Sequence, residues 1–200
     1  MTKFILLLIL IVIFLLIIIP KYKNPVVMKN FISNEECDEI IKLATPRLKT
    51  STVSLNKNID TTVRKSDTAW IQYKENPIID SVMHRCLDMV GKGIDNCESL
   101  QVVKYKPSGF YKPHQDILDD AKNNPRVYTF ILGLNDDYDG GETNFPNLNK
   151  KYKLTKGDLL HFNTLNIWNM ETKFALHGGE PVDKGEKWIC NLWVHKYPIV

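Results

Sequence analysis

The sequence has little excess charge and few cysteines. Its 200 residues carry a formal net charge of only +3, and lysines are interspersed with acidic residues, which argues against a nucleic-acid-binding face. Four cysteines are too few for a disulfide scaffold. Cys86 and Cys97 are a candidate disulfide in an oxidising compartment, and buried free thiols are the alternative. The remaining composition, 44% hydrophobic and 24% charged, is that of one globular domain with its own core.

One apolar run stands apart from this composition. Residues 4–19 are uninterrupted apolar residues between Lys3 and the sequence PKYK. As a helix the run would extend roughly 24 Å, within reach of the ~27 Å hydrocarbon core of a thin membrane. A cleaved signal peptide is the alternative, but the flanking sequence has no A-x-A-like cleavage site. We therefore expect an N-terminal membrane anchor, a signal-anchor helix, over residues 1–23 and a globular domain over 24–200.

Two amphipathic helices are predicted before residue 99, and strands dominate after it. The first helix follows Ser33, which forms a capping box with Glu36, and the second starts at Asn76 with Pro77 in its first position. The later segments are short, β-rich and separated by Gly, Pro, Asn and Asp turns. Two helices beside a run of strands predict an α+β domain built on a sandwich or jelly-roll barrel.

The stretch FYKPHQD places a histidine and an aspartate two positions apart. In a strand such residues face the same side, so His114 and Asp116 are candidate ligands of one metal, with a solvated turn as the alternative. His161 lies in an apolar run and is expected to be a hydrogen-bonded core residue, and His195 lies near the end of the chain. His177 precedes two glycines that would let it approach a metal. Two histidines and one carboxylate are typical of non-haem Fe(II) oxygenases, although zinc uses a similar set.

A lysine begins the late strand KWICNLW. Alternation places four of its residues on one face: Lys187, Ile189, Asn191 and Trp193. A lysine on the inner face of a small barrel is unfavourable unless an anion meets it. A dicarboxylate cosubstrate would be that anion, with Tyr105 and Thr129 available to hydrogen-bond it. The alternative is an exposed strand lysine.

Three segments together resemble one enzyme family. YKPSGFYKPHQD, RVYTFILGLNDDYDGGETNFP and LHGGEPVDKGEKWICNLW are similar, in order, to motifs of the 2-oxoglutarate and Fe(II)-dependent prolyl 4-hydroxylases of the collagen and plant cell-wall type. The resemblance runs from about Phe31 to Trp193. It implies a double-stranded β-helix, or jelly-roll, barrel with flanking helices, so that residues 24–200 form a dioxygenase domain.

The resemblance also assigns residues by position. It implies that the catalytic centre and the iron ligands are His114, Asp116 and His177. It implies that the 2-oxoglutarate contacts are Lys187, Tyr105 and Thr129. It implies a peptide-binding set made of Tyr111, Trp193, Arg64, Ser66, Trp70 and Glu98.

The implied reaction is hydroxylation of peptidyl proline to 4-hydroxyproline. It is coupled to oxidative decarboxylation of 2-oxoglutarate to succinate and CO₂ at a non-haem Fe(II) centre, with L-ascorbate expected to rescue oxidised iron. The expected partners are a proline-rich peptide or protein and, through residues 4–19, a membrane; no nucleic acid is expected. The alternatives are a related dioxygenase acting on another residue or substrate, a membrane-tethered non-catalytic binding module, and a zinc hydrolase.

The expected location is the endoplasmic reticulum, as a single-pass membrane protein with a luminal domain. The flanking charges, taken literally, lean the other way, because Lys3 precedes the apolar run whereas Lys21 and Lys23 follow it. The sequence has no N-x-S/T glycosylation site to indicate the compartment.

Overall fold

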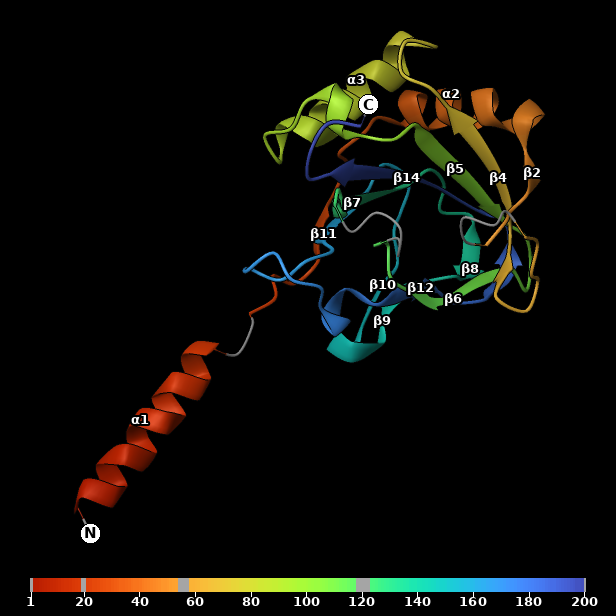
Figure 1. Ribbon diagram of the computed structural model, residues 1–200. Helices are drawn as coiled ribbons and strands as arrows, with labels where there is room; N and C mark the ends of the chain where they lie inside the picture. The colour runs from red at the N-terminus through yellow and green to blue at the C-terminus, as the bar shows by residue number, and fades with distance from the viewer. Residues whose placement is uncertain (1, 19–20, 54–57, 118–122, 200) are drawn as a thin grey trace.

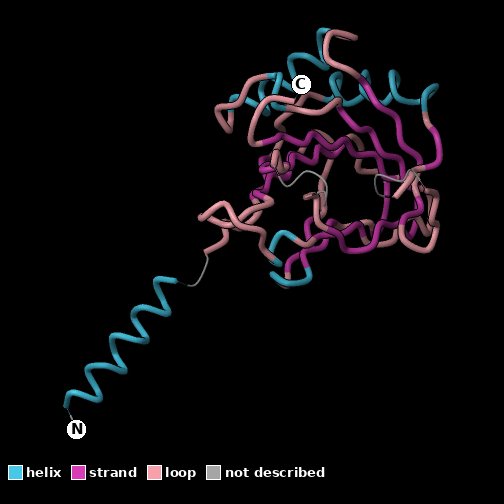
Figure 2. Tube along the Cα trace, in the orientation of Figure 1, coloured by secondary structure: helices cyan, strands magenta, loops and turns pink. Residues whose placement is uncertain are grey.

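The computed structural model describes residues 2–18, 21–53, 58–117 and 123–199, and it shows two facing β-sheets with helices on one outer side (Figures 1 and 2). The larger sheet has seven antiparallel strands in the order β1 (Val26–Met28), β11 (Leu159–Asn163), β7 (Arg126–Gly133), β14 (Lys187–His195), β5 (Leu100–Tyr105), β4 (Asp67–Ile71) and β2 (Lys49–Thr50). The smaller sheet has five, in the order β10 (Lys150–Tyr152), β9 (Thr143–Phe145), β12 (His177–Gly179), β6 (Phe110–His114) and β3 (Arg64–Lys65). A further pair is formed by β13 (Val182–Gly185) and β8 (Tyr138–Gly140).

The predicted jelly-roll class is therefore confirmed, and so are both internal helices. In α2 (Asn34–Ala44), Ser33 Oγ accepts from the Glu36 N–H at 3.2 Å, and Glu36 Oε2 accepts from the Ser33 N–H at 2.8 Å. In α3 (Pro77–Asp88), Asn76 Oδ1 accepts from the Ile78 N–H at 2.8 Å. These bonds satisfy N–H groups that have no partner within the helix. Short 3₁₀ turns lie between the larger elements: Thr45–Arg47, Ile94–Asn96, Pro146–Leu148 and Lys173–Ala175.

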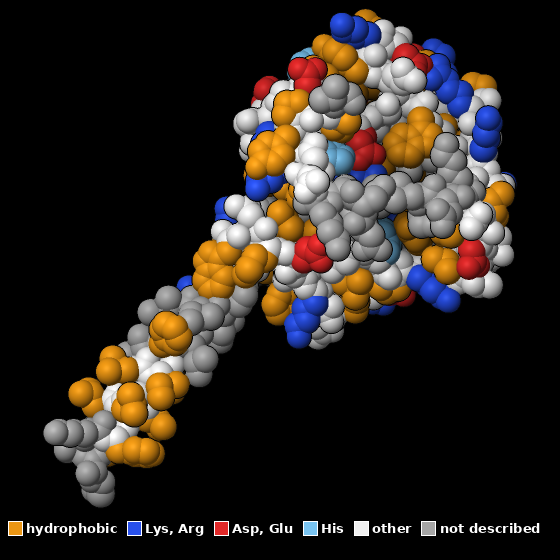
Figure 3. Space-filling view, in the orientation of Figure 1, with side chains coloured by type: hydrophobic (Ala, Val, Ile, Leu, Met, Phe, Trp, Pro, Cys, Tyr) orange, Lys and Arg blue, Asp and Glu red, His pale blue; other side chains and the backbone are white. Residues whose placement is uncertain are grey.

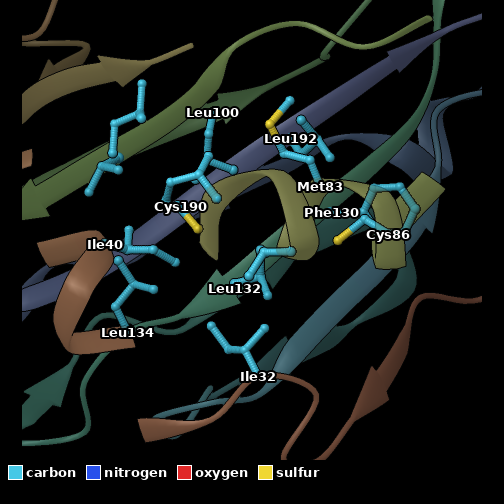
Figure 4. Close-up of a cluster of buried hydrophobic side chains, with 14 of the residues drawn as sticks. Ile32, Ile40, Met83, Cys86, Leu100, Phe130, Leu132, Leu134, Cys190 and Leu192 are labelled. Atoms are coloured by element: carbon cyan, nitrogen blue, oxygen red, sulfur yellow. The ribbon is translucent and has the colours of Figure 1, made fainter. Parts of the chain in front are cut away.

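The main apolar core lies between the two helices and the outer face of the seven-stranded sheet. Ile40 of α2 and Met83 of α3 are buried against Cys190 and Leu192 of β14 and Leu100 of β5 (Figure 4). A second cluster lies between the two sheets and includes Phe145, Phe162, Ile131, Leu160 and Ile189. Burial of the first cluster attaches the helices to the larger sheet, and burial of the second joins the two sheets.

The four cysteines are free thiols. Cys37, Cys86 and Cys190 are buried and Cys97 is half-buried, so the candidate Cys86–Cys97 disulfide is not formed, and the buried-thiol alternative holds for Cys86. Burial raises the pKa of Cys86 to about 12, which keeps this thiol protonated. Cys86 and Cys190 act as small apolar side chains of the main core.

The N-terminal apolar run forms α1 (Thr2–Ile18), which extends away from the domain with exposed apolar side chains (Figures 1 and 3). The prediction of a helix is confirmed. The prediction that it spans a membrane is not, because no helix within the described ranges is both long enough and apolar enough to cross one.

Candidate active site

A cavity of about 670 Å³ lies between the two sheets, beside the second apolar cluster. Side chains from both sheets line it, including the three candidate metal ligands, Lys187 and several aromatic residues. The sequence placed these groups in three separate segments, and the antiparallel pairing of the strands brings them together.

The three candidate ligands meet where β6 ends and β12 begins. His114 and His177 are cross-strand partners, and Asp116 follows two positions after His114. Asp116 Oδ1 lies 3.7 Å from His114 Nε2, and Asp116 Oδ2 lies 3.7 Å from His177 Nε2. One donor atom from each residue lies within 4.8 Å of the other two, close enough for one ion to bind all three.

Glycine at position 178 permits this close pairing. A Cβ atom at Gly178 would lie 2.8 Å from the carbonyl oxygen of Tyr111 and 2.9 Å from the Pro113 nitrogen. The sequence suggested that the glycines after His177 relieve crowding at a metal. In the structure Gly178 instead relieves crowding between β12 and β6, which sets the spacing of His177 and His114.

Backbone carbonyls orient both imidazoles. His114 Nδ1 lies 2.9 Å from the Lys112 carbonyl oxygen, and His177 Nδ1 lies 3.0 Å from the Ala175 carbonyl oxygen. A carbonyl oxygen only accepts hydrogen bonds, so Nδ1 carries the proton in each ring and Nε2 is the available ligand atom. This pattern of a second hydrogen bond behind each ligating histidine is usual at metal sites.

The charge state of the site suits a divalent cation. Burial and the neighbouring His177 lower the pKa of His114 to about 3, so that its imidazole is neutral at pH 7. Burial alone would raise the pKa of Asp116, but His177, His114, Arg126 and the Thr129 hydroxyl hold it below its usual value. Nitrogen donors with one carboxylate, facing a cavity, fit the facial triad of Fe(II) oxygenases.

Thr129 contacts the metal site directly. Its Oγ1 donates to Asp116 Oδ2 at 2.6 Å. A threonine hydroxyl has one proton, so while it donates to Asp116 it has none to donate to a carboxylate of 2-oxoglutarate. In this structure the Thr129 hydroxyl orients Asp116, and its 2-oxoglutarate contact stays a prediction.

Lys187 faces the cavity together with Ile189, Asn191 and Trp193, the residues that alternation places on its side of β14, so the exposed-lysine alternative does not hold. Lys187 is 3% exposed and forms no ion pair with any residue in the described part of the chain. Burial and the nearby Lys153 lower its pKa to about 8, and Glu142 partly offsets this effect. Its Nζ lies 5.2 Å from the centre of the buried Tyr105 ring, which also lines the cavity. An anion bound in the cavity would offset the desolvation of this buried ammonium group.

Thr143 is a cavity residue that the sequence reasoning missed. It is 4% exposed and lines the cavity from β9. Before it, Gly141 has φ +67°, and a Cβ there would lie 3.2 Å from Lys187 Cδ, so the glycine turn leaves room for the lysine. The available signal was the alternation of Thr143 and Phe145, which bury on the same side of β9.

Four of the six predicted peptide-binding residues line the cavity: Arg64, Trp70, Tyr111 and Trp193. The Trp70 and Trp193 rings are 6.1 Å apart between centroids. The Tyr111 ring stacks on His114 at 3.7 Å, and the Arg64 guanidinium lies 4.7 Å from the centre of the Tyr111 ring. One aromatic wall of the cavity, the Tyr111 ring, is therefore in contact with a candidate metal ligand.

Ser66 and Glu98 are not among the residues that line the cavity; each contacts an arginine that does. Ser66 Oγ accepts from Arg64 Nε at 3.0 Å. Glu98 accepts from Arg126 Nη2 at 2.8 Å and lies 2.9 Å from His195 Nε2. The structure therefore places both residues against neighbouring cations, not against the cavity.

Arg126 is a second cavity residue that the sequence reasoning missed. Its guanidinium carbon lies 4.1 Å from the centre of the Trp193 ring, and Nη1 donates to the Asp116 carbonyl oxygen at 3.3 Å. Simple alternation from Thr129 would put Arg126 on the opposite face of β7. A register shift opposite His195 brings it to the cavity side, and sequence periodicity does not predict such a bulge.

Comparison with known proteins agrees with this site. A sequence model of the 2OG-Fe(II) oxygenase superfamily matches residues 100–195. The fold matches a viral collagen prolyl hydroxylase of Paramecium bursaria Chlorella virus-1, solved with 2-oxoglutarate, with a TM-score of 0.71, 30% identity, and coverage of 88% of this chain and 97% of that one. The chain is thus a 2-oxoglutarate-dependent dioxygenase, and iron and 2-oxoglutarate are the groups its site uses.

Sequence relatives narrow the family. A protein of Acanthamoeba polyphaga mimivirus, named as a candidate prolyl 4-hydroxylase, is 36% identical over 182 residues, covering 86% of this chain and 74% of its own length. Prolyl 4-hydroxylase 1 of Arabidopsis thaliana is 33% identical over 193 residues, covering 86% and 68%. The chain belongs to the prolyl 4-hydroxylase family.

Proposed function

We propose that the protein hydroxylates peptidyl proline to 4-hydroxyproline, using O₂ and 2-oxoglutarate and releasing succinate and CO₂. The observation that carries this proposal is one cavity that joins a two-histidine, one-carboxylate cluster to an unpaired buried lysine and to aromatic walls. The relatives named as prolyl 4-hydroxylases support the choice of proline as the target residue.

His114, Asp116 and His177 would hold Fe(II). When bound, Fe(II) supplies the oxidising chemistry that splits O₂ between 2-oxoglutarate and the proline C4–H bond. The protein contributes fixed ligand geometry: two carbonyls hold the imidazoles, and Thr129 holds Asp116. L-Ascorbate is the expected reductant for iron oxidised outside productive turnover.

Lys187 would bind the far carboxylate of 2-oxoglutarate. Its burial and its lack of a protein counter-ion among the described residues support this role, because an incoming carboxylate repays its desolvation. Tyr105, beside Lys187, and Thr143, which the structure adds, are the hydroxyl groups available to the same carboxylate. In this proposal the Thr129 hydroxyl keeps its hydrogen bond to Asp116 and does not contact 2-oxoglutarate.

The aromatic side of the cavity would bind the peptide. Proline-rich segments form a polyproline II helix, which docks on aromatic grooves with little loss of conformational entropy. Trp70, Trp193 and Tyr111 provide such surfaces, and Arg64 and Arg126 border them. Ser66 and Glu98 act indirectly by holding these two arginines.

We further propose that the domain resides in the lumen of the endoplasmic reticulum. The exposed apolar side chains of α1, which run from Phe4 to Val12 and include Phe14, support this location, since an apolar N-terminal segment is the feature by which chains enter the secretory pathway. Protease protection of the domain in sealed microsomes is the expected result. Digestion of the domain without detergent would contradict it.

Succinate release and mass spectrometry test the activity. Proline-rich peptides are incubated with 2-oxoglutarate and ascorbate, with and without Fe(II). We expect iron-dependent, peptide-stimulated succinate and one added oxygen on proline. His177→Ala should abolish both products, whereas the matched control His84→Ala, whose ring lies by Tyr73 outside the cavity, should retain them. Oxygen added to another residue, or no succinate with any peptide, would overturn the proposal.

A further inference from the structure

The side chain of Asn191 has an unused hydrogen-bond acceptor. Asn191 lies on β14 and is 9% exposed, and its Nδ2 donates to Gln101 Oε1 at 3.1 Å. Its Oδ1 is buried and has no hydrogen-bond partner in the parts of the chain that the structure describes. A buried acceptor left without a donor costs ~1–3 kcal/mol, so a native structure seldom keeps one without a reason.

The surroundings of Asn191 place its missing partner in the cavity. Along the inner face of β14 its neighbours are Ile189 and Trp193. Across the sheet its register partners are Gln101 on β5 and Ile131 on β7. All of these residues line the same cavity as Asn191. The space beside the Asn191 amide that protein does not fill is therefore cavity. Water supplies the donor when the cavity holds no peptide, and a peptide that displaces this water must replace its hydrogen bond.

The chemistry of the proposed substrates restricts this donor. 2-Oxoglutarate is fully ionised at neutral pH and has no N–H or O–H group. A peptidyl proline has no backbone N–H. Asn191 lies four residues from Lys187, roughly 13 Å along the strand and toward Trp193, so it faces the peptide side of the cavity. The donor that remains in a peptide is the backbone N–H of a residue next to the proline.

We propose that Asn191 Oδ1 accepts a hydrogen bond from the backbone N–H of a residue adjacent to the target proline. The site thereby selects peptides in which proline alternates with other residues over uninterrupted polyproline. This inference rests on the proposed prolyl hydroxylation. Both kinds of peptide form a polyproline II helix, so groove shape alone does not separate them, whereas only the alternating peptide offers an N–H beside each proline.

An amide-to-ester exchange in the peptide isolates this hydrogen bond. An alternating peptide is compared with two analogues in which the N–H before or after the target proline is replaced by an ester oxygen. For the wild-type enzyme we expect one analogue to show about tenfold lower kcat/KM, which corresponds to ~1.4 kcal/mol, and polyproline to show a similar loss. Asn191→Ala should process the amide and ester peptides at nearly equal kcat/KM.

Two further variants define the role of the oxygen. Asn191→Asp keeps an oxygen acceptor of the same shape. It removes the Nδ2 that donates to Gln101, but rotation of the Gln101 amide lets its NH₂ group donate to the carboxylate, so the variant should keep the preference for the amide peptide. Ile189→Val trims a neighbouring wall residue without changing any hydrogen-bonding group, and its amide-to-ester ratio should match that of the wild type.

Equal sensitivity of the wild type and Asn191→Ala to the ester would overturn the inference, as would loss of the preference in Asn191→Asp. Hydroxyproline formation is measured in every arm. Absence of hydroxyproline from all peptides would instead refute the proposed function, so the two failures are distinguishable.

Discussion

Replacing Lys187 by methionine removes a buried charge while keeping most of the side-chain volume, and it should change stability and ligand binding in opposite directions. Burial lowers the pKa of Lys187 from 10.5 to about 8. Since one pKa unit corresponds to ~1.36 kcal/mol, the charged form costs the ligand-free fold about 3 kcal/mol at neutral pH. We expect Lys187→Met to raise the unfolding free energy of the ligand-free protein by up to this amount, or about 6–12 °C in Tm.

The stability gain of Lys187→Met should depend on pH in a defined direction. Between pH 8 and about 10.5 the unfolded wild-type chain holds a proton on Lys187 that the folded protein has released, so wild-type stability rises with pH in this window. The methionine variant lacks this titration. Its advantage should be full at pH 7 and should shrink steadily above pH 8.

Binding of 2-oxoglutarate should show the reverse effect. The incoming carboxylate pairs with Lys187 in the wild type, so saturating 2-oxoglutarate with Fe(II) under anaerobic conditions should raise Tm, and Lys187→Met should lose most of this shift. Loss of a charge-assisted pair should raise the KM for 2-oxoglutarate on the order of 10²-fold. Thermal and urea unfolding with and without ligand measure both effects. A variant that is less stable when empty yet keeps the ligand shift would refute the reasoning.

Four other side chains give separable outcomes. Asp116→Asn keeps the shape of a ligand but removes its charge, and Fe(II) affinity measured by anaerobic calorimetry should fall at least tenfold; unchanged affinity would exclude Asp116 as a ligand. Thr129→Val removes the bond to Asp116 and should lower Fe(II) affinity roughly tenfold without raising the KM for 2-oxoglutarate, whereas Thr143→Val should raise that KM. Glu98→Gln weakens the hold on Arg126 and should raise the peptide KM about tenfold at constant KM for 2-oxoglutarate; equal changes in both would indicate a general folding defect.

Features that depend on local chemistry were predictable from the sequence. The caps at Ser33 and Asn76 follow from side chains that bond to nearby backbone N–H groups. The two-residue period of a strand grouped Lys187 with Ile189, Asn191 and Trp193 on one face, but it did not say which face is inward. The same period suggested a shared side for His114 and Asp116, and both line the cavity although Asp116 lies beyond the end of β6. His177 was selected among the remaining histidines for the two glycines that follow it, and the motif resemblance assigned the same residue. The distance in sequence between ligands on different strands carries no geometric rule of its own.

Features that depend on how strands and helices meet were decided by the tertiary structure. The bond from Thr129 to Asp116 joins β7 to the residue after β6, and no local pattern assigns it over a contact with 2-oxoglutarate. A register shift turns Arg126 to the cavity side, where Glu98 binds it and so stays away from the peptide surface. The thiol of Cys86 is buried in the main core and remains free.

The sequence by itself determined the elements, the residues that share a strand face and the types of residue available for iron and 2-oxoglutarate, because these depend on neighbours along the chain. Only the tertiary structure decided that the Thr129 hydroxyl donates to Asp116 and that Arg126 enters the cavity. It also decided that Asn191 Oδ1 has no donor among the described residues. Those outcomes depend on strand register and on competition for one proton or one acceptor. Both are set by residues distant in sequence.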